Sequence, residues 1–259
     1  MENLKSTGYA PVNGIQMYYE VYGSGNTPLV LLHGGGSTIQ TSFNNILPFL
    51  SAEREVIAVE LQAHGRTSDR DAPETFIQDA DDVAALLKYL EIEKANFFGF
   101  SNGGTTVLQI AMRHPHLVNK IIDLAGATKR DGFVPGFFDR FSQVSLNDMP
   151  LVYHEEFLKL TPNRARLQAM FEKDVARMKN FADIPDDDIR AIKAEALIII
   201  NDKDVVTAEH TVELSKLIPG GQLLIMPGFH GECIGELLTA KPGSKMAEIT
   251  AGLINEFLK

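Results

Sequence analysis

The sequence contains a single cysteine, no tryptophan and no long apolar run. Cys233 has no partner for an internal disulfide, which excludes a disulfide scaffold and a Cys-rich zinc site and favours a reducing compartment. Apolar runs such as Leu29–Leu32 are far shorter than the roughly 20 residues that a membrane helix needs. Residues 1–14 hold no apolar core segment, so we expect no signal peptide there. These absences predict a cytoplasmic protein that does not bind membranes.

The sequence also contains fewer basic than acidic residues. The chain has 24 Lys and Arg against 34 Asp and Glu, a formal net charge of −10, which repels phosphate backbones. We therefore expect no nucleic-acid partner. With 259 residues, 44% of them hydrophobic and 22% charged, the chain can bury a sizeable core as one domain or as one domain with an insertion. This composition excludes a disordered or fibrous protein.

Short apolar runs recur along the chain and are bounded by Gly, Asn, Asp or Pro. They lie at residues 15–22, 29–32, 56–59, 96–100, 121–124, 197–200 and 223–226. Most of them are apolar throughout and do not alternate, which is typical of strands buried on both faces of a parallel sheet. Asn13 and Gly14 precede the first run and predict a hairpin turn.

Helical patterns fill the gaps between these runs and predict an α/β layered sheet. One helix is expected after Thr75, which has a capping-box pattern, and another over residues 102–114, ending before Pro115. Thr207 is expected to cap a third. In the final helix, an apolar face is expected to pack on the core; its predicted members are Ile249, Leu253, Ile254 and Phe257.

Residues 127–194 interrupt the alternation, because they contain no convincing strand. Helices are predicted around residues 151–160, 163–179 and 186–193, and this stretch holds seven of the 15 Phe. We interpret it as a helical insertion over the sheet, with residues 1–126 and 195–259 forming the main domain. The Phe side chains either line a binding site or pack the insertion onto the main domain.

The pentapeptide Gly99–Gly103 matches the pattern G-x-S-x-G and lies between a predicted strand and a predicted helix. A serine at such a turn is held with its hydroxyl exposed, and the following helix N-terminus offers N–H groups to a developing anion. Ser101 is therefore the candidate nucleophile. The simpler alternative is a glycine-rich turn with an incidental serine.

A second glycine-rich loop, His33–Gly36, follows the predicted strand at residues 29–32. Three consecutive glycines allow the backbone to turn sharply and direct its N–H groups into a pocket. A phosphate-binding loop is the alternative, but the spacing and the lysine that such a loop requires are absent. His33 is expected to hold the loop by hydrogen bonds.

A serine nucleophile needs a base, and the base needs an orienting carboxylate. Among the seven histidines, His230 follows the last predicted strand and is the leading candidate, with His64 the runner-up. Asp204, in the loop after residues 197–200, is the leading acid, ahead of Asp202 and Asp123. These aspartates could instead be solvated turn residues. The chosen residues occur in the order Ser, Asp, His on three strand-end loops.

With these motifs together, the chain resembles the α/β-hydrolase superfamily, most of all its single-domain esterase, haloperoxidase-like and C–C hydrolase branch. The resemblance rests on the H-G-G-G, H-G-R-T-S, G-F-S-N-G-G, N-D-K-D-V-V and P-G-F-H-G-E segments in that order. It implies an eight-stranded, mostly parallel sheet flanked by helices, with a helical cap inserted after the sixth strand, at residues 127–194. It further implies oxyanion donors in the glycine loop and after the nucleophile, for which we select the N–H groups of Gly35 and Asn102.

The chain departs from the family pattern at three positions. Gln62 stands where an arginine is frequent, Asn201 where a glycine precedes the acid, and Asn102 where an apolar residue often follows the nucleophile. A serine nucleophile, in place of aspartate, disfavours haloalkane-dehalogenase and epoxide-hydrolase chemistry.

We therefore expect a serine hydrolase that forms an acyl-enzyme and needs neither metal nor cofactor. Its leading substrate is a small-molecule carboxylic ester with an apolar or aromatic group; the predicted substrate contacts are Gly34, Phe100, Phe137 and Phe138. C–C bond hydrolysis and haloperoxidase-like perhydrolysis use the same residues and are alternatives. A receptor that keeps the fold and only captures ligands is an alternative of another class. The oligomeric state is left open.

Overall fold

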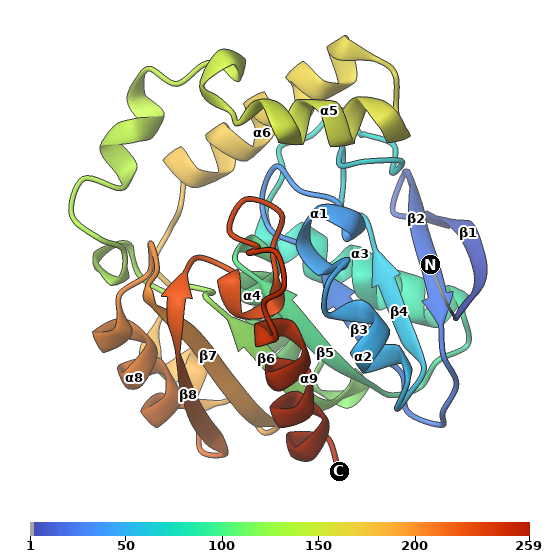
Figure 1. Cartoon of the computed structure of the whole chain (residues 1–259), viewed down its shortest axis with the longest axis vertical. Helices are drawn as coiled ribbons and strands as arrows, with labels where there is room; N and C mark the ends of the chain where they lie inside the picture. The colour runs from blue at the N-terminus through green and yellow to red at the C-terminus, as the bar shows by residue number, and fades with distance from the viewer. Residues whose placement is uncertain (1–2) are drawn as a thin grey trace.

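The computed structural model describes residues 3–259, which form one eight-stranded sheet with helices on both faces (Figure 1). The strand order is β1-β2-β4-β3-β5-β6-β7-β8, antiparallel where β2 meets β1 and β4 and parallel elsewhere. The predicted α/β-hydrolase fold, with its mostly parallel sheet, is confirmed. The strands are β1 (Leu4–Val12), β2 (Ile15–Tyr22), β3 (Leu29–Leu32), β4 (Val56–Val59), β5 (Ala95–Phe100), β6 (Val118–Leu124), β7 (Glu195–Lys203) and β8 (Gly221–Phe229).

The central strands are buried on both faces because their side chains alternate between two hydrophobic cores. In β3, Leu29 and Leu31 join the core that includes residues of α1, α2 and α9, whereas Val30 and Leu32 join the core with α3, α4 and α8. The helices on these two faces are α1 (Ile39–Phe43), α2 (Leu47–Ser51), α9 (Met246–Phe257), α3 (Phe76–Tyr89), α4 (Asn102–Arg113) and α8 (Ala208–Leu217). This two-sided burial explains the uninterrupted apolar runs.

Asn13 and Gly14 form the predicted hairpin turn. Both have positive φ angles, 43° and 87°, and the flanking Val12 and Ile15 pair across β1 and β2. Strand β1 itself has no apolar run, because this edge strand leaves most of its side chains exposed.

The predicted helix starts are confirmed at two caps. The Thr75 hydroxyl accepts a hydrogen bond from the Gln78 N–H at the start of α3, and the Thr207 hydroxyl accepts one from the His210 N–H at the start of α8. Within residues 3–259, no helix is long and apolar enough to span a bilayer.

The segment between β6 and β7 is helical, as predicted, and most of it lies beyond the carboxyl ends of the parallel strands (Figure 1, green to yellow), whereas its last helix packs against α4 and α8. Its elements are the 3-10 helices η2 (Arg130–Gly132), η3 (Phe138–Ser142) and η4 (Leu146–Asp148), followed by α5 (Leu151–Leu160), α6 (Arg164–Lys179) and α7 (Asp186–Arg190). The division of the chain into a main domain and a cap stays a prediction.

The prediction of which residues in the final helix face the core is partly wrong. In α9, Ile254 is buried, but Ile249 and Leu253 are 51% and 42% exposed. Ala247 and Ala251 face the core instead. The reason is steric: α9 packs against α2 and the 3-10 helix η5 (Glu232–Ile234), and small side chains allow a close approach.

Substitutions of Ile254 and Leu253 by alanine should therefore differ strongly in their effect on stability. Ile254→Ala removes a fully buried side chain and should lower the free energy of unfolding by about 2–5 kcal/mol. Leu253→Ala, one position away in the same helix, should cost less than about 1 kcal/mol, because much of that side chain is already in water. Urea unfolding followed by circular dichroism measures both, and equal losses would contradict the observed orientation of α9.

Candidate active site

Ser101 lies at the sharp turn between β5 and α4, with φ 56° and ψ −119°. This left-handed backbone conformation is strained for a residue with a side chain, and tight packing maintains it. A Cβ atom on Gly103 would lie 2.1 Å from the Leu32 carbonyl oxygen, and one on Gly99 would lie 2.0 Å from the Gly103 carbonyl oxygen. Both glycines of the motif are therefore required where backbones meet.

His230, just after β8, is hydrogen-bonded to Asp204, just after β7. The Nδ1–Oδ1 distance is 2.6 Å, and the same oxygen accepts the N–H groups of Val205 and Val206 at 2.7 and 3.3 Å. A carboxylate only accepts, so Nδ1 carries a hydrogen and, in the neutral ring, Nε2 is free to accept a proton. The other two acid candidates have different surroundings: Asp202 accepts the Gly228 N–H, and Asp123 is fully buried.

Charge and burial act on the pKa of His230 in opposite directions. Burial lowers the pKa, whereas the adjacent Asp204 carboxylate raises it and prevails, so the pKa lies above its ordinary value. Burial also raises the pKa of Asp123 to about 7, and the nearby charge of Asp204 adds to the effect. Asp123 is thus a second buried acid close to the acid that orients His230.

Ser101 and His230 line the same cavity, of about 330 Å³, beneath the helical segment between β6 and β7. This volume fits a small organic molecule. The lining is mostly apolar; its larger apolar members are Phe133, Phe137, Phe141, Met149, Met170, Phe171, Met178 and Phe181. Its carboxylates are Asp148 and Asp174, and no Lys or Arg within residues 3–259 lines it.

Gly35 and Asn102, the predicted oxyanion donors, are neighbours at this cavity. A Cβ atom on Gly35 would lie 2.5 Å from Asn102 Nδ2. The Asn102 N–H is at the first position of α4, where no intrahelical acceptor exists. In the glycine loop, the Gly34 N–H donates to Ser42 Oγ and the Gly36 N–H is hydrogen-bonded to Asp174, which leaves the Gly35 N–H without an acceptor within residues 3–259.

The structure brings one of the four predicted substrate contacts, Phe137, to the cavity wall. Phe138 lies behind it, against Phe133 and under the Arg130 guanidinium at 3.7 Å from the ring centre. Phe100 packs on the His230 ring, with the ring centres 4.7 Å apart. Gly34 lies beside Phe100 and Ser101: a Cβ atom on Gly34 would meet the Phe100 ring at 3.2 Å and the Cβ of Ser101 at 3.3 Å.

Sequence reasoning missed Asp174 and Tyr153, which both line the cavity from the helical segment. Tyr153 donates a hydrogen bond to Glu236, and Asp174 contacts the glycine loop. Neither residue lies in a motif, so only the docking of α5 and α6 reveals them.

His64, the alternative base, is fully buried and pairs with Asp174. Within residues 3–259, no group of three or more His, Cys, Asp or Glu is arranged to hold a metal ion.

Comparisons with known proteins agree with this fold. A family model for the alpha/beta hydrolase fold matches residues 27–187. The chain is 29% identical to human serine hydrolase BPHL over 233 residues, which cover 83% of this chain and 77% of that protein. It is 30% identical to 2-hydroxy-6-oxo-2,4-heptadienoate hydrolase of Pseudomonas putida over 237 residues, which cover 81% of this chain and 84% of that protein.

A solved structure gives the same result at lower sequence identity. A meta-cleavage product hydrolase from Pseudomonas fluorescens superposes with a TM-score of 0.77 at 21% identity, covering 98% of this chain and 97% of that one. The matched residues, the sheet order and the serine turn all agree, and the chain is a member of the alpha/beta hydrolase family.

Proposed function

We propose that this hydrolase is a serine esterase that acts on small neutral carboxylic esters with an apolar or aromatic group. The observation that carries the proposal is the 2.6 Å hydrogen bond between His230 and Asp204 at a cavity that Ser101 also lines. A serine, an imidazole and a carboxylate from three strand-end loops are the groups that acyl transfer requires.

In the proposed reaction, the Ser101 hydroxyl attacks the ester carbonyl carbon while His230 Nε2 takes its proton. Asp204 keeps the proton on Nδ1 and stabilises the imidazolium that forms. The oxyanion accepts hydrogen bonds from the Gly35 and Asn102 N–H groups, and each such donor is typically worth about 10²–10³ in turnover. His230 then protonates the leaving alcohol, and water attacks the acyl-enzyme by the same route.

The charge of the cavity wall favours a neutral substrate. Its carboxylates, Asp148 and Asp174, and its lack of Lys and Arg within residues 3–259 give an anionic substrate no cation to pair with. The side chains of Phe133, Phe137 and Phe141 offer an apolar or aromatic group a surface to pack on. This combination supports a neutral ester with an apolar or aromatic group as the substrate.

Hydrolysis of a C–C bond is the second candidate, because the similar proteins described above include a meta-cleavage product hydrolase and a 2-hydroxy-6-oxo-2,4-heptadienoate hydrolase. One of them acts on 2-hydroxy-6-oxo-2,4-heptadienoate, a name that denotes a carboxylate. A carboxylate would have to enter this cavity without a basic partner, so we rank C–C hydrolysis below ester hydrolysis.

Replacing the nucleophile should abolish esterase activity. We expect Ser101→Ala to lose turnover of p-nitrophenyl acetate and labelling by a fluorophosphonate probe, because both need the activated hydroxyl. Ser6→Ala, on the exposed edge strand β1, is the matched control and should keep both. Undiminished turnover in Ser101→Ala would refute the nucleophile, and a wild-type protein that the probe does not label would favour the ligand-capturing receptor.

The pH dependence of turnover should reflect the pair formed by His230 and Asp204. Because His230 accepts a proton only when neutral, activity should fall as the pH drops through its raised pKa, above the ordinary value of about 6.5. Asp204→Asn removes the carboxylate, so the acid limb should move to lower pH and kcat should fall by about 10⁴-fold. Asp202→Asn, a neighbouring aspartate that contacts the Gly228 N–H, should leave the limb in place. If the fall of activity at acidic pH were unchanged in Asp204→Asn, Asp204 would not be the carboxylate that acts on His230.

Substrate charge should separate the two candidate reactions. Between p-nitrophenyl valerate and the p-nitrophenyl monoester of glutaric acid, which adds a terminal carboxylate, we expect kcat/KM to favour the neutral ester by about 10-fold or more, since each 1.4 kcal/mol of unpaired charge costs that factor. Rates of hydrolysis in buffer alone correct for intrinsic reactivity. Equal or better use of the anionic ester would reverse the ranking and favour the C–C hydrolase.

A further inference from the structure

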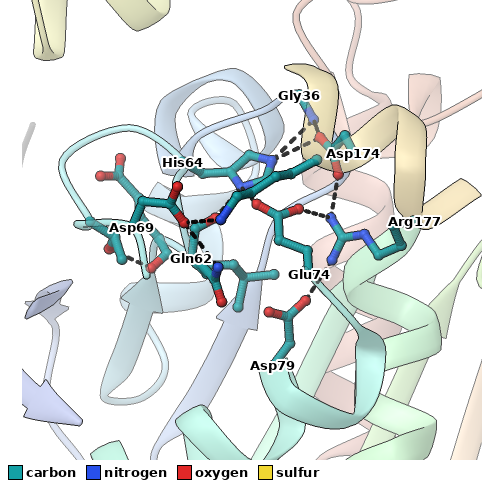
Figure 2. Close-up of polar contacts among 12 residues, drawn as sticks. Gly36, Gln62, His64, Asp69, Glu74, Asp79, Asp174 and Arg177 are labelled. Atoms are coloured by element: carbon teal, nitrogen blue, oxygen red, sulfur yellow. Dashed lines mark hydrogen bonds and ion pairs between the residues drawn. The ribbon is translucent and has the colours of Figure 1, made fainter. Parts of the chain in front are cut away.

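A chain of buried ionic contacts connects α6 of the helical segment to the glycine loop of the main sheet domain (Figure 2). Asp174 Oδ2 lies 2.9 Å from His64 Nε2 and 2.5 Å from the Gly36 backbone nitrogen, and Asp174 Oδ1 pairs with Arg177. Only 13% of the Asp174 side chain is exposed, toward the cavity that holds Ser101. One carboxylate therefore joins an insertion helix, a buried histidine and the loop that carries the proposed oxyanion donor.

Hydrogen-bond geometry specifies the charge of His64. Its Nδ1 is 2.8 Å from the Gln62 carbonyl oxygen, which only accepts, so Nδ1 carries a hydrogen. Its Nε2 faces the Asp174 carboxylate, which also accepts, so Nε2 carries a hydrogen as well. The ring is thus an imidazolium and cannot accept the Gly36 N–H, 3.2 Å from Nε2. That N–H donates to Asp174.

The groups around His64 agree with a charged ring. Glu74 Oε1 is 3.9 Å from Nδ1 and Asp174 is in contact, whereas Arg177 is the opposing cation. The neighbouring His33 ring, tilted by 46° with the ring centres 4.9 Å apart, is neutral, because burial and the charge of His64 lower its pKa to about 3. Burial lowers the pKa of His64, but Asp174 outweighs it and the pKa rises to about 9.

Two consecutive peptide planes in the glycine loop are each held by a hydrogen bond to a buried side chain. His33 Nε2 accepts the Leu61 N–H, so its Nδ1 donates to the Gly34 carbonyl oxygen at 2.8 Å. That carbonyl shares a trans peptide with the Gly35 N–H, which must point the other way. The next peptide is held through the Gly36 N–H by Asp174. Gly35 lies between a contact from the sheet domain and a contact from the insertion.

We propose that Asp174 and His64 are positioning residues that orient the Gly35 N–H, so that the oxyanion site is complete only while α6 is docked on the sheet domain. This inference rests on the proposed function and extends it to a residue pair that touches no reacting atom. Its pH dependence has a definite sign. The contact is present below the raised pKa of His64 and is lost as the pH rises through about 9, where the deprotonated Nε2 repels the carboxylate.

The competing explanation is that Asp174 only docks α6, and the chain offers a matched control for it. Lys173, the preceding residue, also ties α6 to the sheet domain, through Asp69 Oδ1 and the carbonyl oxygens of Arg70 and Ala72 at 2.6–2.9 Å. It has no contact with the glycine loop. Lys173→Met therefore weakens docking without touching the peptide planes around Gly35.

The test is steady-state hydrolysis of a p-nitrophenyl ester by the full chain from neutral to alkaline pH, with thermal unfolding of each variant. Asp174→Asn should lower kcat by about 10-fold or more, short of the roughly 10²–10³ for losing a donor outright, with little change in KM. Lys173→Met should lower the Tm and leave kcat unchanged. Equal effects of both substitutions on kcat and Tm would overturn the inference in favour of simple docking.

His64→Gln supplies a second measurement that does not depend on the stability of Asp174→Asn. The glutamine amide can still donate to Asp174 but does not titrate. The loss of kcat should therefore be smaller than in Asp174→Asn, and the decrease of kcat with rising pH near pH 9 should disappear. The Gly36 amide proton resonance should titrate with the same midpoint in the wild type and not in His64→Gln. An alkaline limb and a Gly36 titration that persist in His64→Gln would overturn the inference, whereas absent labelling of wild-type Ser101 would instead refute the proposed function.

Discussion

The candidate site depends on the close contact between the start of α4 and the end of β3. Gly103 lies directly against the backbone carbonyls of Leu32 and His33, at distances that leave no room for a Cβ atom. This contact holds Ser101, the candidate nucleophile, in its left-handed conformation and brings the glycine loop, which begins at His33, beside it. A larger residue at position 103 would force α4 and β3 apart and would move Ser101 and the Asn102 N–H away from the Gly35 N–H.

Burial of charge gives the helical segment a defined position. Arg177 of α6 is almost fully buried and faces Asp79, Glu74 and Asp174, so each carboxylate gains a partner that offsets part of its desolvation. Burial nevertheless raises the pKa of Glu74 to about 8 and that of Asp79 to about 6, although Arg177 opposes both shifts. These ion pairs favour the observed position of α6, because a shift of the helix would leave several buried charges unpaired.

The cavity combines two kinds of surface with different chemical consequences. Phenylalanine and methionine side chains from the helical segment give it an apolar wall, while Asp148 and Asp174 add carboxylates, of which Asp174 is paired with Arg177 and His64 behind the wall. An apolar wall lowers the local dielectric and strengthens the hydrogen bonds that a developing oxyanion would receive. The lack of Lys and Arg in this wall, within residues 3–259, is the reason for proposing ester hydrolysis ahead of C–C hydrolysis.

Local signals in the sequence predicted seven of the eight described strands and most helices, and they selected Ser101, Asp204 and His230 as candidates, because apolar runs, caps and glycine motifs act within a few residues. The buried face of α9 was partly mispredicted, since close packing against α2 selected Ala247 and Ala251 over the larger Ile249 and Leu253. Asp174 could not be predicted at all. Its neighbours, His64 and Gly36, lie 110 and 138 positions away, and only the docking of α6, which buries and pairs these charges, brings them together.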